Sequence, residues 1–139
     1  MNEAIRSIYA RAAAAVREKD RDAFAELFHP EVELWSTITD RVYRGHDGVK
    51  AWFDMLTTRL VLAPTITEIE AVDADAWYVS GRLQASMPGG VIADRPITWL
   101  VVLNEGLIWR FQPVESRADA EVVAHRVQPG RTPPMPPDQ

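Results

Sequence analysis

The sequence contains no cysteine, which excludes disulfide bonds and thiolate metal sites and leaves no trace of a redox compartment. It also lacks a long apolar run at its start, because Glu3, Arg6 and Arg11 interrupt the apolar residues of the first 16 positions. Such a segment is typical of neither a secretory signal nor a membrane span. We therefore expect no membrane partner and a cytoplasmic protein.

An excess of basic residues is missing as well. The chain has 15 Lys and Arg against 20 Asp and Glu, a formal net charge of -5. Binding to nucleic acid needs a concentrated positive surface, so we expect no nucleic-acid partner. The histidines, His29, His46 and His125, are scattered without the spacing of a metal site, and we expect neither a metal nor another cofactor.

Apolar residues, by contrast, are plentiful. They make up 47% of the 139 residues, which is enough for the core of one domain. Apolar side chains at helical spacing predict a first helix over residues 5–16 and a later one over residues 49–56. Between them, Asp20 or Asp22 can cap a short helix, and Pro30 is expected to close it. A last helix is expected over residues 117–126.

Alternating apolar and polar residues predict strands at 32–38, 65–72, 77–86, 91–104 and 107–114. Turn residues separate the last four and predict three consecutive hairpins, hence a mostly antiparallel sheet. Helices followed by strands indicate an α+β domain in which helices pack on one sheet face. The proline-rich residues 128–139 are predicted to be a disordered or extended tail, which leaves residues 1–127 as the domain.

The stretch DRVYRGHDGVKAWF, residues 40–53, gathers side chains that serve acid, base and anion chemistry. Most of it is explained as a helix start, with Asp47 placed to accept backbone N–H groups. His46 is the candidate catalytic residue because imidazole titrates near neutral pH, although the positive end of the helix dipole opposes its protonation. Tyr43 either reaches a pocket mouth or packs against the following helix, and packing is favoured.

Three segments, DRDAFAELFHPEVEL, YRGHDGVKAWF and LNEGLIWRFQPVESR, resemble the nuclear transport factor 2-like superfamily, in particular its SnoaL-like and ketosteroid-isomerase-like branches. The resemblance runs from residue 5 to residue 124. It implies a cone-shaped, curved, mostly antiparallel sheet packed by the N-terminal helices around a pocket, and dimers formed through the convex sheet face. Members include polyketide cyclases, isomerases, dehydratases, epoxide hydrolases and proteins without catalysis, so the fold alone does not assign the activity.

The chemical groups of a ketosteroid isomerase are not kept. The resemblance puts the general-base aspartate at Ser36, the donor aspartate at Thr98 and the donor tyrosine at Ala12, with Tyr9 one turn earlier. A hydroxyl without an activating partner is a poor base, so steroid isomerisation is not expected. Arginine and aspartate two apart, as in the epoxide-hydrolase branch, are replaced by an arginine and a glutamine at residues 82–84.

Residues 77–86 separate into an apolar and a polar set, which lie on opposite faces of a strand. Alternation alone favours solvent for the polar set, whereas the resemblance implies that it lines the concave pocket. On the second interpretation Arg82 is a clamp for a carboxylate, enolate or phenolate. The alternatives are that Arg82 pairs with an acid such as Glu115 or points to water. The ligand-binding residues expected are Tyr9, Ser36, Tyr78, Ser80, Arg82, Gln84, Thr98 and Phe111.

The same interpretation places Trp35, Trp77 and Trp99 on the convex face. An exposed patch of this kind usually marks an interface, so a homodimer is expected. Two functions stay open. One is a cofactor-free isomerase, cyclase or lyase acting on a small, partly aromatic or polyketide-like molecule, with His46 or a bound water moving protons. The other is a non-catalytic ligand-binding or dimerisation module.

Overall fold

The computed structural model describes residues 3–36, 41–58 and 61–126, with the side chains of residues 61–64 and 92–93 left aside. The helices are α1 (Glu3–Glu18), α2 (Arg21–Ala25), α3 (Gly45–Thr58) and α4 (Arg117–Arg126). The strands are β1 (Phe28–Trp35), β2 (Val42–Arg44), β3 (Val61–Asp73), β4 (Ala76–Met87), β5 (Gly90–Asn104) and β6 (Leu107–Pro113). They form one sheet in the order β2-β1-β6-β5-β4-β3, in which only the described pair β1 and β6 is parallel. The predicted α+β class with a curved, mostly antiparallel sheet is confirmed, while the predicted tail lies outside the described residues.

The second helix is shorter than its apolar pattern indicates. Asp20 caps it as predicted, because its side chain accepts a hydrogen bond of 3.1 Å from the backbone N–H of Ala23. The helix ends at Ala25, however, and Phe28 already belongs to β1, where it pairs with Ile108 of β6. The expectation that the helix runs on to Pro30 was therefore wrong, since pairing with a distant strand overrides local periodicity.

The segment before α3 is largely architectural. Residues 42–44 form the edge strand β2, which the sequence pattern did not reveal, and α3 begins directly after it. Gly45 has a φ of +68°, a left-handed conformation that favours glycine. Val49 and Phe53 then bury the apolar stripe of α3, as predicted.

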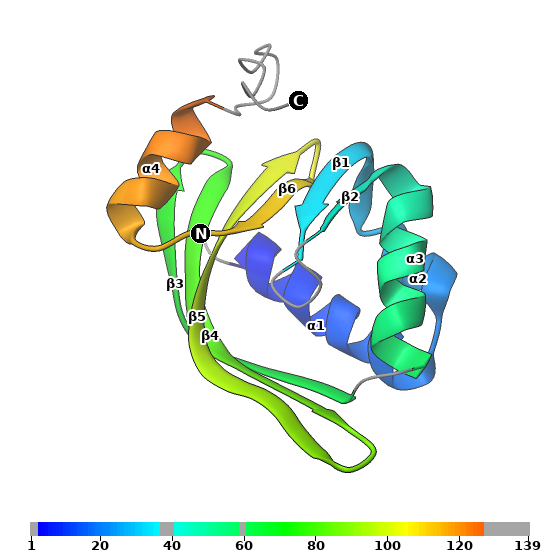
Figure 1. Ribbon diagram of the computed structural model, residues 1–139. Coiled ribbons are helices and arrows are strands. Elements are labelled where there is room, and N and C mark those ends of the chain that lie inside the picture. Colours follow the sequence, from blue (N-terminus) through cyan, green and yellow to red (C-terminus); the bar gives the residue numbers. More distant parts are fainter. Residues whose placement is uncertain (1–2, 37–40, 59–60, 127–139) are drawn as a thin grey trace.

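The sheet curves around the N-terminal helices. Figure 1 shows β3, β4 and β5 bending past α1, which lies on their concave side with α3, whereas α4 lies outside the sheet. Gly81 of β4 permits a very close approach to β3, because a Cβ atom there would lie less than 3.0 Å from the carbonyl oxygen of Thr65. Beside this point the register of β3 shifts between Ile66 and Glu68.

Two hydrophobic cores lie on the two sheet faces. The helix-facing core joins α1, α2 and α3 to the concave face and includes Trp77, Val79, Trp99 and Val101. The outer core lies under α4 and consists of Ala76, Leu100, Val102, Val114, Ala120 and Ala124, with Val72, Tyr78, Trp109 and Val123 packed against it. The alternation in β4 and β5 was predicted correctly, but the side assigned to each set was wrong. The apolar set faces the helices because burying it removes the larger apolar area from water.

The three-tryptophan patch that motivated the predicted homodimer does not exist. Trp77 and Trp99 are 6% and 5% exposed and lie in the helix-facing core. Trp35 alone lies on the outer face, half-buried, with the guanidinium of Arg110 5.0 Å above its ring. The homodimer stays a prediction, without this argument for it. None of the helices in the described part of the chain is long and apolar enough to span a membrane.

Candidate ligand-binding site

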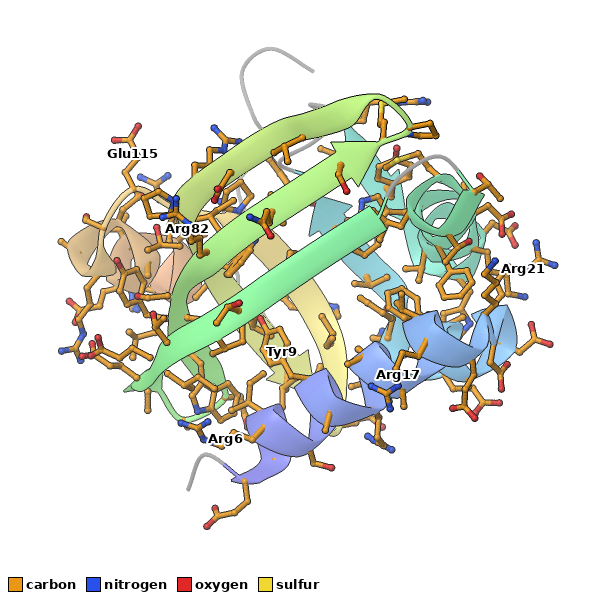
Figure 2. All side chains as sticks on the ribbon, turned by 90° about the horizontal axis from the view of Figure 1, so that it is seen from below. Arg6, Tyr9, Arg17, Arg21, Arg82 and Glu115 are labelled. Carbon is orange, nitrogen blue, oxygen red and sulfur yellow. The ribbon has the colours of Figure 1, made fainter. Side chains whose placement is uncertain are left out.

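Two hydrogen-bond donors are buried in the interior without an acceptor among the residues that the structure describes. Tyr9 projects from α1 toward the strands (Figure 2) and packs against the helix-facing core, to which Trp77 of β4 also belongs. Tyr9 as a whole is half-buried, but its hydroxyl oxygen is enclosed. Neither this hydroxyl nor the Nε1 of Trp77 has a hydrogen-bond partner among the described residues. Buried polar groups nearly always have a hydrogen-bond partner, so we expect a water or a ligand atom to accept from each of these donors.

The protonation state of Tyr9 follows from this enclosure. Removing the phenolate from water is unfavourable, so burial raises the pKa of Tyr9 above its ordinary value. The hydroxyl therefore keeps its proton at neutral pH and can donate it to an acceptor oxygen.

The same enclosure predicts a dependence of stability on alkaline pH. When the chain unfolds, Tyr9 regains an ordinary pKa of about 10, whereas in the folded protein its pKa is higher. Above about pH 10 the unfolded state therefore loses a proton that the folded state retains, and the free energy of unfolding falls by up to about 1.4 kcal/mol per pH unit. Urea titrations from pH 8 to 11 should show this loss in the wild type and a smaller loss in Tyr9→Phe. Parallel curves for the two proteins would contradict an enclosed hydroxyl.

A hollow of 350 Å³ opens where β6 ends. Its lining consists of Ser36, Arg95, Pro96, Ile97, Thr98, Pro113 and Val114. Ser36, 8% exposed, accepts a hydrogen bond of 3.2 Å from the Nε1 of Trp52 in α3. Because Trp52 and Ile97 both pack against the helix-facing core, the hollow borders that core directly.

Aromatic rings pack against one another in the helix-facing core beside Ser36. The ring of Trp52 lies 5.9 Å from that of Phe24 and 6.5 Å from that of Phe111, measured between centroids. The ring of Phe111 in turn lies 6.1 Å from that of Trp99. Tilted aromatic pairs at these distances attract one another and offer flat apolar surface.

The sequence profile of the SnoaL-like domain matches residues 9–111, most of the chain. The chain belongs to the SnoaL-like domain family. No curated protein sequence matches it significantly.

Solved structures share the fold of this SnoaL-like protein. A putative polyketide cyclase from Sinorhizobium meliloti is 19% identical with a TM-score of 0.63, over 78% of this chain and 94% of that one. An epoxide hydrolase from Mycobacterium tuberculosis is 15% identical with a TM-score of 0.67, over 90% and 96%. A third protein, from M. tuberculosis and solved with estradiol-17β-hemisuccinate, is 18% identical with a TM-score of 0.66, over 81% and 93%. At these identities the likeness concerns the fold.

The polar set of β4 faces away from the helices of this SnoaL-like protein, contrary to expectation. Arg82 donates from Nε to Asp94 Oδ1 at 2.7 Å, and Gln84 donates to Asp94 Oδ2 at 3.3 Å. Tyr78 packs against the outer core, and Ser80 is half-buried on the same face. The predicted position of Arg82 in the concave pocket was wrong. The helices bury the other set of side chains on β4, which includes Trp77 and Val79, so Arg82 lies on the opposite face.

The alternative in which Arg82 pairs with an acid is closer to the structure. Its partner is Asp94 of the neighbouring strand rather than Glu115. Glu115 is exposed and its side chain points outward near α4 (Figure 2). Neither carboxylate therefore takes part in the helix-facing core.

Ser36 and Thr98 come together, although from different faces. Both line the hollow, but the hydroxyl of Thr98 donates to the carbonyl oxygen of Val114. Thr98 pairs with Ser80 across β4 and so belongs to the outward set, which makes its expected place on the concave face wrong. Phe111 faces the helices as expected. Its neighbour on that face is Trp99, whereas Thr98 had been expected there.

His46 has a structural contact. Its Nε2 lies 2.7 Å from the carbonyl oxygen of Phe28, and since a carbonyl only accepts, Nε2 carries the proton and donates it. This bond ties the first turn of α3 to β1, away from the residues that line the hollow. Tyr43 packs against the helix-facing core, as favoured, with the guanidinium of Arg41 5.6 Å above its ring.

Two residues of the site were missed by the sequence interpretation. Trp77 was assigned to the convex face, and Arg95 was not considered. The alternation of apolar and polar residues in β4 and β5 would have placed both residues correctly if we had assigned the apolar set to the helix-facing side. Within the described residues, no group of three His, Asp or Glu side chains could hold a metal ion.

Proposed function

We propose that this SnoaL-like protein binds a small, mostly apolar organic molecule between α1 and the concave sheet face. The hydroxyl of Tyr9 and the indole N–H of Trp77 donate hydrogen bonds to oxygen atoms of that molecule. The hollow beside Ser36 is the entrance, because it borders the same core.

The observation that carries this proposal is the pair of enclosed donors without acceptors. Leaving a buried donor unpaired costs about 1 to 3 kcal/mol, and no atom of the described residues accepts a hydrogen bond from either of these two donors. A ligand oxygen that meets either donor removes this penalty on binding, whereas a purely hydrocarbon ligand does not. The site therefore selects apolar molecules that carry carbonyl, ether or phenol oxygens.

Two of the structural neighbours support this class of ligand. One is a putative polyketide cyclase, and another was solved with estradiol-17β-hemisuccinate, an apolar ring system that carries oxygen atoms. Both concern other proteins with the same fold, and the donors proposed here are residues of this chain.

Cofactor-free isomerase, cyclase or lyase chemistry is the second candidate function. A neutral phenol that donates to a carbonyl oxygen stabilises the enolate that forms when the neighbouring carbon loses a proton. The raised pKa of Tyr9 favours this role, since the phenol stays protonated. In this scheme a water molecule or a group of the ligand accepts the proton. His46 is hydrogen-bonded to the carbonyl oxygen of Phe28, and the side chain of Glu115 points away from the helix-facing core. Binding is for this reason the primary proposal.

Tyr9→Phe tests the proposal in both the free and the bound protein. The variant keeps the ring but removes the enclosed hydroxyl, so the free protein is expected to become more stable by about 1 kcal/mol. The affinity for 2-naphthol or 1-tetralone, which offer a phenol and a ketone oxygen, should fall about tenfold. Thermal unfolding and tryptophan fluorescence titration measure the two effects.

The matched control is Tyr78→Phe, because Tyr78 lies on the opposite sheet face against the outer core. It should leave both affinities unchanged. Equal affinity of the wild type and Tyr9→Phe for these compounds, or a complete lack of binding by naphthol, tetralone and steroid probes, would refute the proposed site.

A further inference from the structure

We propose that the edge strand β2 and helix α3 together bind an extended acidic peptide, which adds a strand to the sheet beside β2. The groove between the two elements has a volume of 610 Å³, within the usual range of about 300 to 1,000 Å³ for binding clefts. Residues 41–44 form one wall of the groove and α3 forms the other. The groove shares no residue with the hollow at Ser36 or with the two enclosed donors.

The backbone of β2 offers hydrogen-bonding groups on the side of the groove. In the described part of the chain β2 is the edge of the sheet and pairs only with β1. The backbone N–H of Ser36 donates to the carbonyl oxygen of Arg41 at 3.0 Å, which makes these two residues a hydrogen-bonded pair. Such pairs alternate along antiparallel strands. The N–H and C=O of Val42 and the N–H of Arg44 therefore point away from β1, where an added strand completes the ladder.

Helix α3 forms the second wall. A Cβ atom on Gly48 would lie 3.0 Å from the backbone carbonyl carbon of Tyr43, so the first turn of α3 lies directly against β2. Ala51 and Met55 follow at spacings of three and four residues, on the same face of the helix, and line the groove further along. Their apolar side chains suit the side chains of a peptide better than they suit an inorganic anion.

The charges beside β2 favour an acidic partner. Arg41 and Arg44 are exposed and line the groove. Arg41 lies 5.6 Å above the ring of Tyr43, and none of the described carboxylates forms an ion pair with it. Glu33 lies 3.5 Å from Arg44 but only 2.6 Å from Arg110. One carboxylate is thus shared by two guanidinium groups, which leaves net positive charge on this edge.

The acidic residue that lines the groove is itself paired. Asp54 of α3 lies 3.0 Å from Nη1 of Arg21, outside the groove. Because its charge is offset by that neighbour, Asp54 repels an incoming carboxylate less than an unpaired acid would.

The spacing of the two arginines defines the peptide. Arg41 and Arg44 are three residues apart, so their side chains lie on opposite faces of β2. Directly paired residues of neighbouring strands share a face. Two acids that are also three residues apart can therefore meet both arginines, while the two residues between them lie opposite Val42 and Tyr43 and are best apolar. The pattern acid, apolar, apolar, acid reads the same in both directions, so it fits either strand orientation.

The experiment uses a capped hexapeptide in which two glutamates enclose two valines, with a threonine at each end. Titration of the full chain at pH 7.5 and low salt should show saturable binding with a Kd below about 1 mM. Amide NMR signals of Val42 and Arg44 should shift, because their N–H groups gain acceptors. Replacing both glutamates with glutamines should weaken binding about tenfold.

Methyl groups on the peptide nitrogens test the strand pairing. Successive N–H groups of a strand point alternately to its two sides, so methylation of one alternate set of the four central nitrogens blocks pairing with β2, and methylation of the other set does not. One set should weaken binding about tenfold more than the other. Equal effects of the two sets, or equally tight binding of N-acetylglutamate, would show a simple anion site and overturn the proposal.

The protein variants test the charges. Arg41→Gln should lower the affinity for the glutamate peptide about fivefold to tenfold and leave that for the glutamine peptide unchanged. The matched control is Arg82→Gln, because Arg82 is an exposed strand arginine that pairs with Asp94 at 2.7 Å, outside the groove. It should bind the peptide like the wild type, as should Tyr9→Phe. Equal affinity of the wild type and Arg41→Gln, or no binding up to about 5 mM, overturns the peptide groove but leaves the interior site standing.

Discussion

Trp99→Ala is expected to lower the free energy of unfolding by about 4 kcal/mol, as is usual when a large aromatic residue is removed from a core. The indole is 5% exposed, and its ring lies 6.1 Å from that of Phe111 in the helix-facing core. Truncation leaves a cavity beside Phe111 in the helix-facing core, which the surrounding side chains fill only in part. Urea or guanidinium denaturation followed by circular dichroism measures the change.

The control for this variant is Gln84→Ala on the opposite face of the sheet. Gln84 is exposed and shares Asp94 with Arg82, so its removal should change stability by less than about 0.5 kcal/mol. The comparison also tests which face is inside. If Trp99→Ala cost less than about 1 kcal/mol and instead dissociated an oligomer in sedimentation, the indole would lie on an outer interface and the face assignment would be wrong.

Gly81→Ala is expected to destabilise the protein by about 3 kcal/mol, the upper part of the range for overpacking. The added methyl group would lie less than 3.0 Å from the carbonyl oxygen of Thr65. That obstacle is backbone rather than a flexible side chain, so β3 and β4 have to separate at the point where the sheet curves. Thermal unfolding of the two proteins at equal concentration gives the difference.

Gly89→Ala is the comparison for this second variant. Gly89 has a φ of +110° and nothing within 4 Å of the position of an added Cβ, so the substitution costs only backbone strain of about 1 kcal/mol. If Gly81→Ala were as mild as Gly89→Ala, the close approach of β3 to β4 would not constrain the fold. A large loss confined to Gly81→Ala indicates that the sheet needs a residue without a side chain here.

The sequence by itself determined which segments are helices and which are strands. The stripe of Ile5 and Ile8, the cap at Asp20 and the three hairpin turns each act over a few neighbouring residues, and each appears in the structure. Local signals failed only where a distant partner intervened. Phe28 left the helical pattern because it pairs with Ile108, and the edge strand β2 forms because it lies beside β1.

Tertiary structure alone decided which face of the sheet is the inside, and with it the candidate site. A period of two separates two sets of side chains without saying which set the helices cover. Here α1, α2 and α3 cover the set of Trp77 and Trp99, and this placement turns Arg82 toward Asp94 and Arg95 toward the hollow. The reason is that burial is a property of the packed layers: the apolar set lowers the free energy only where helices exclude water from it.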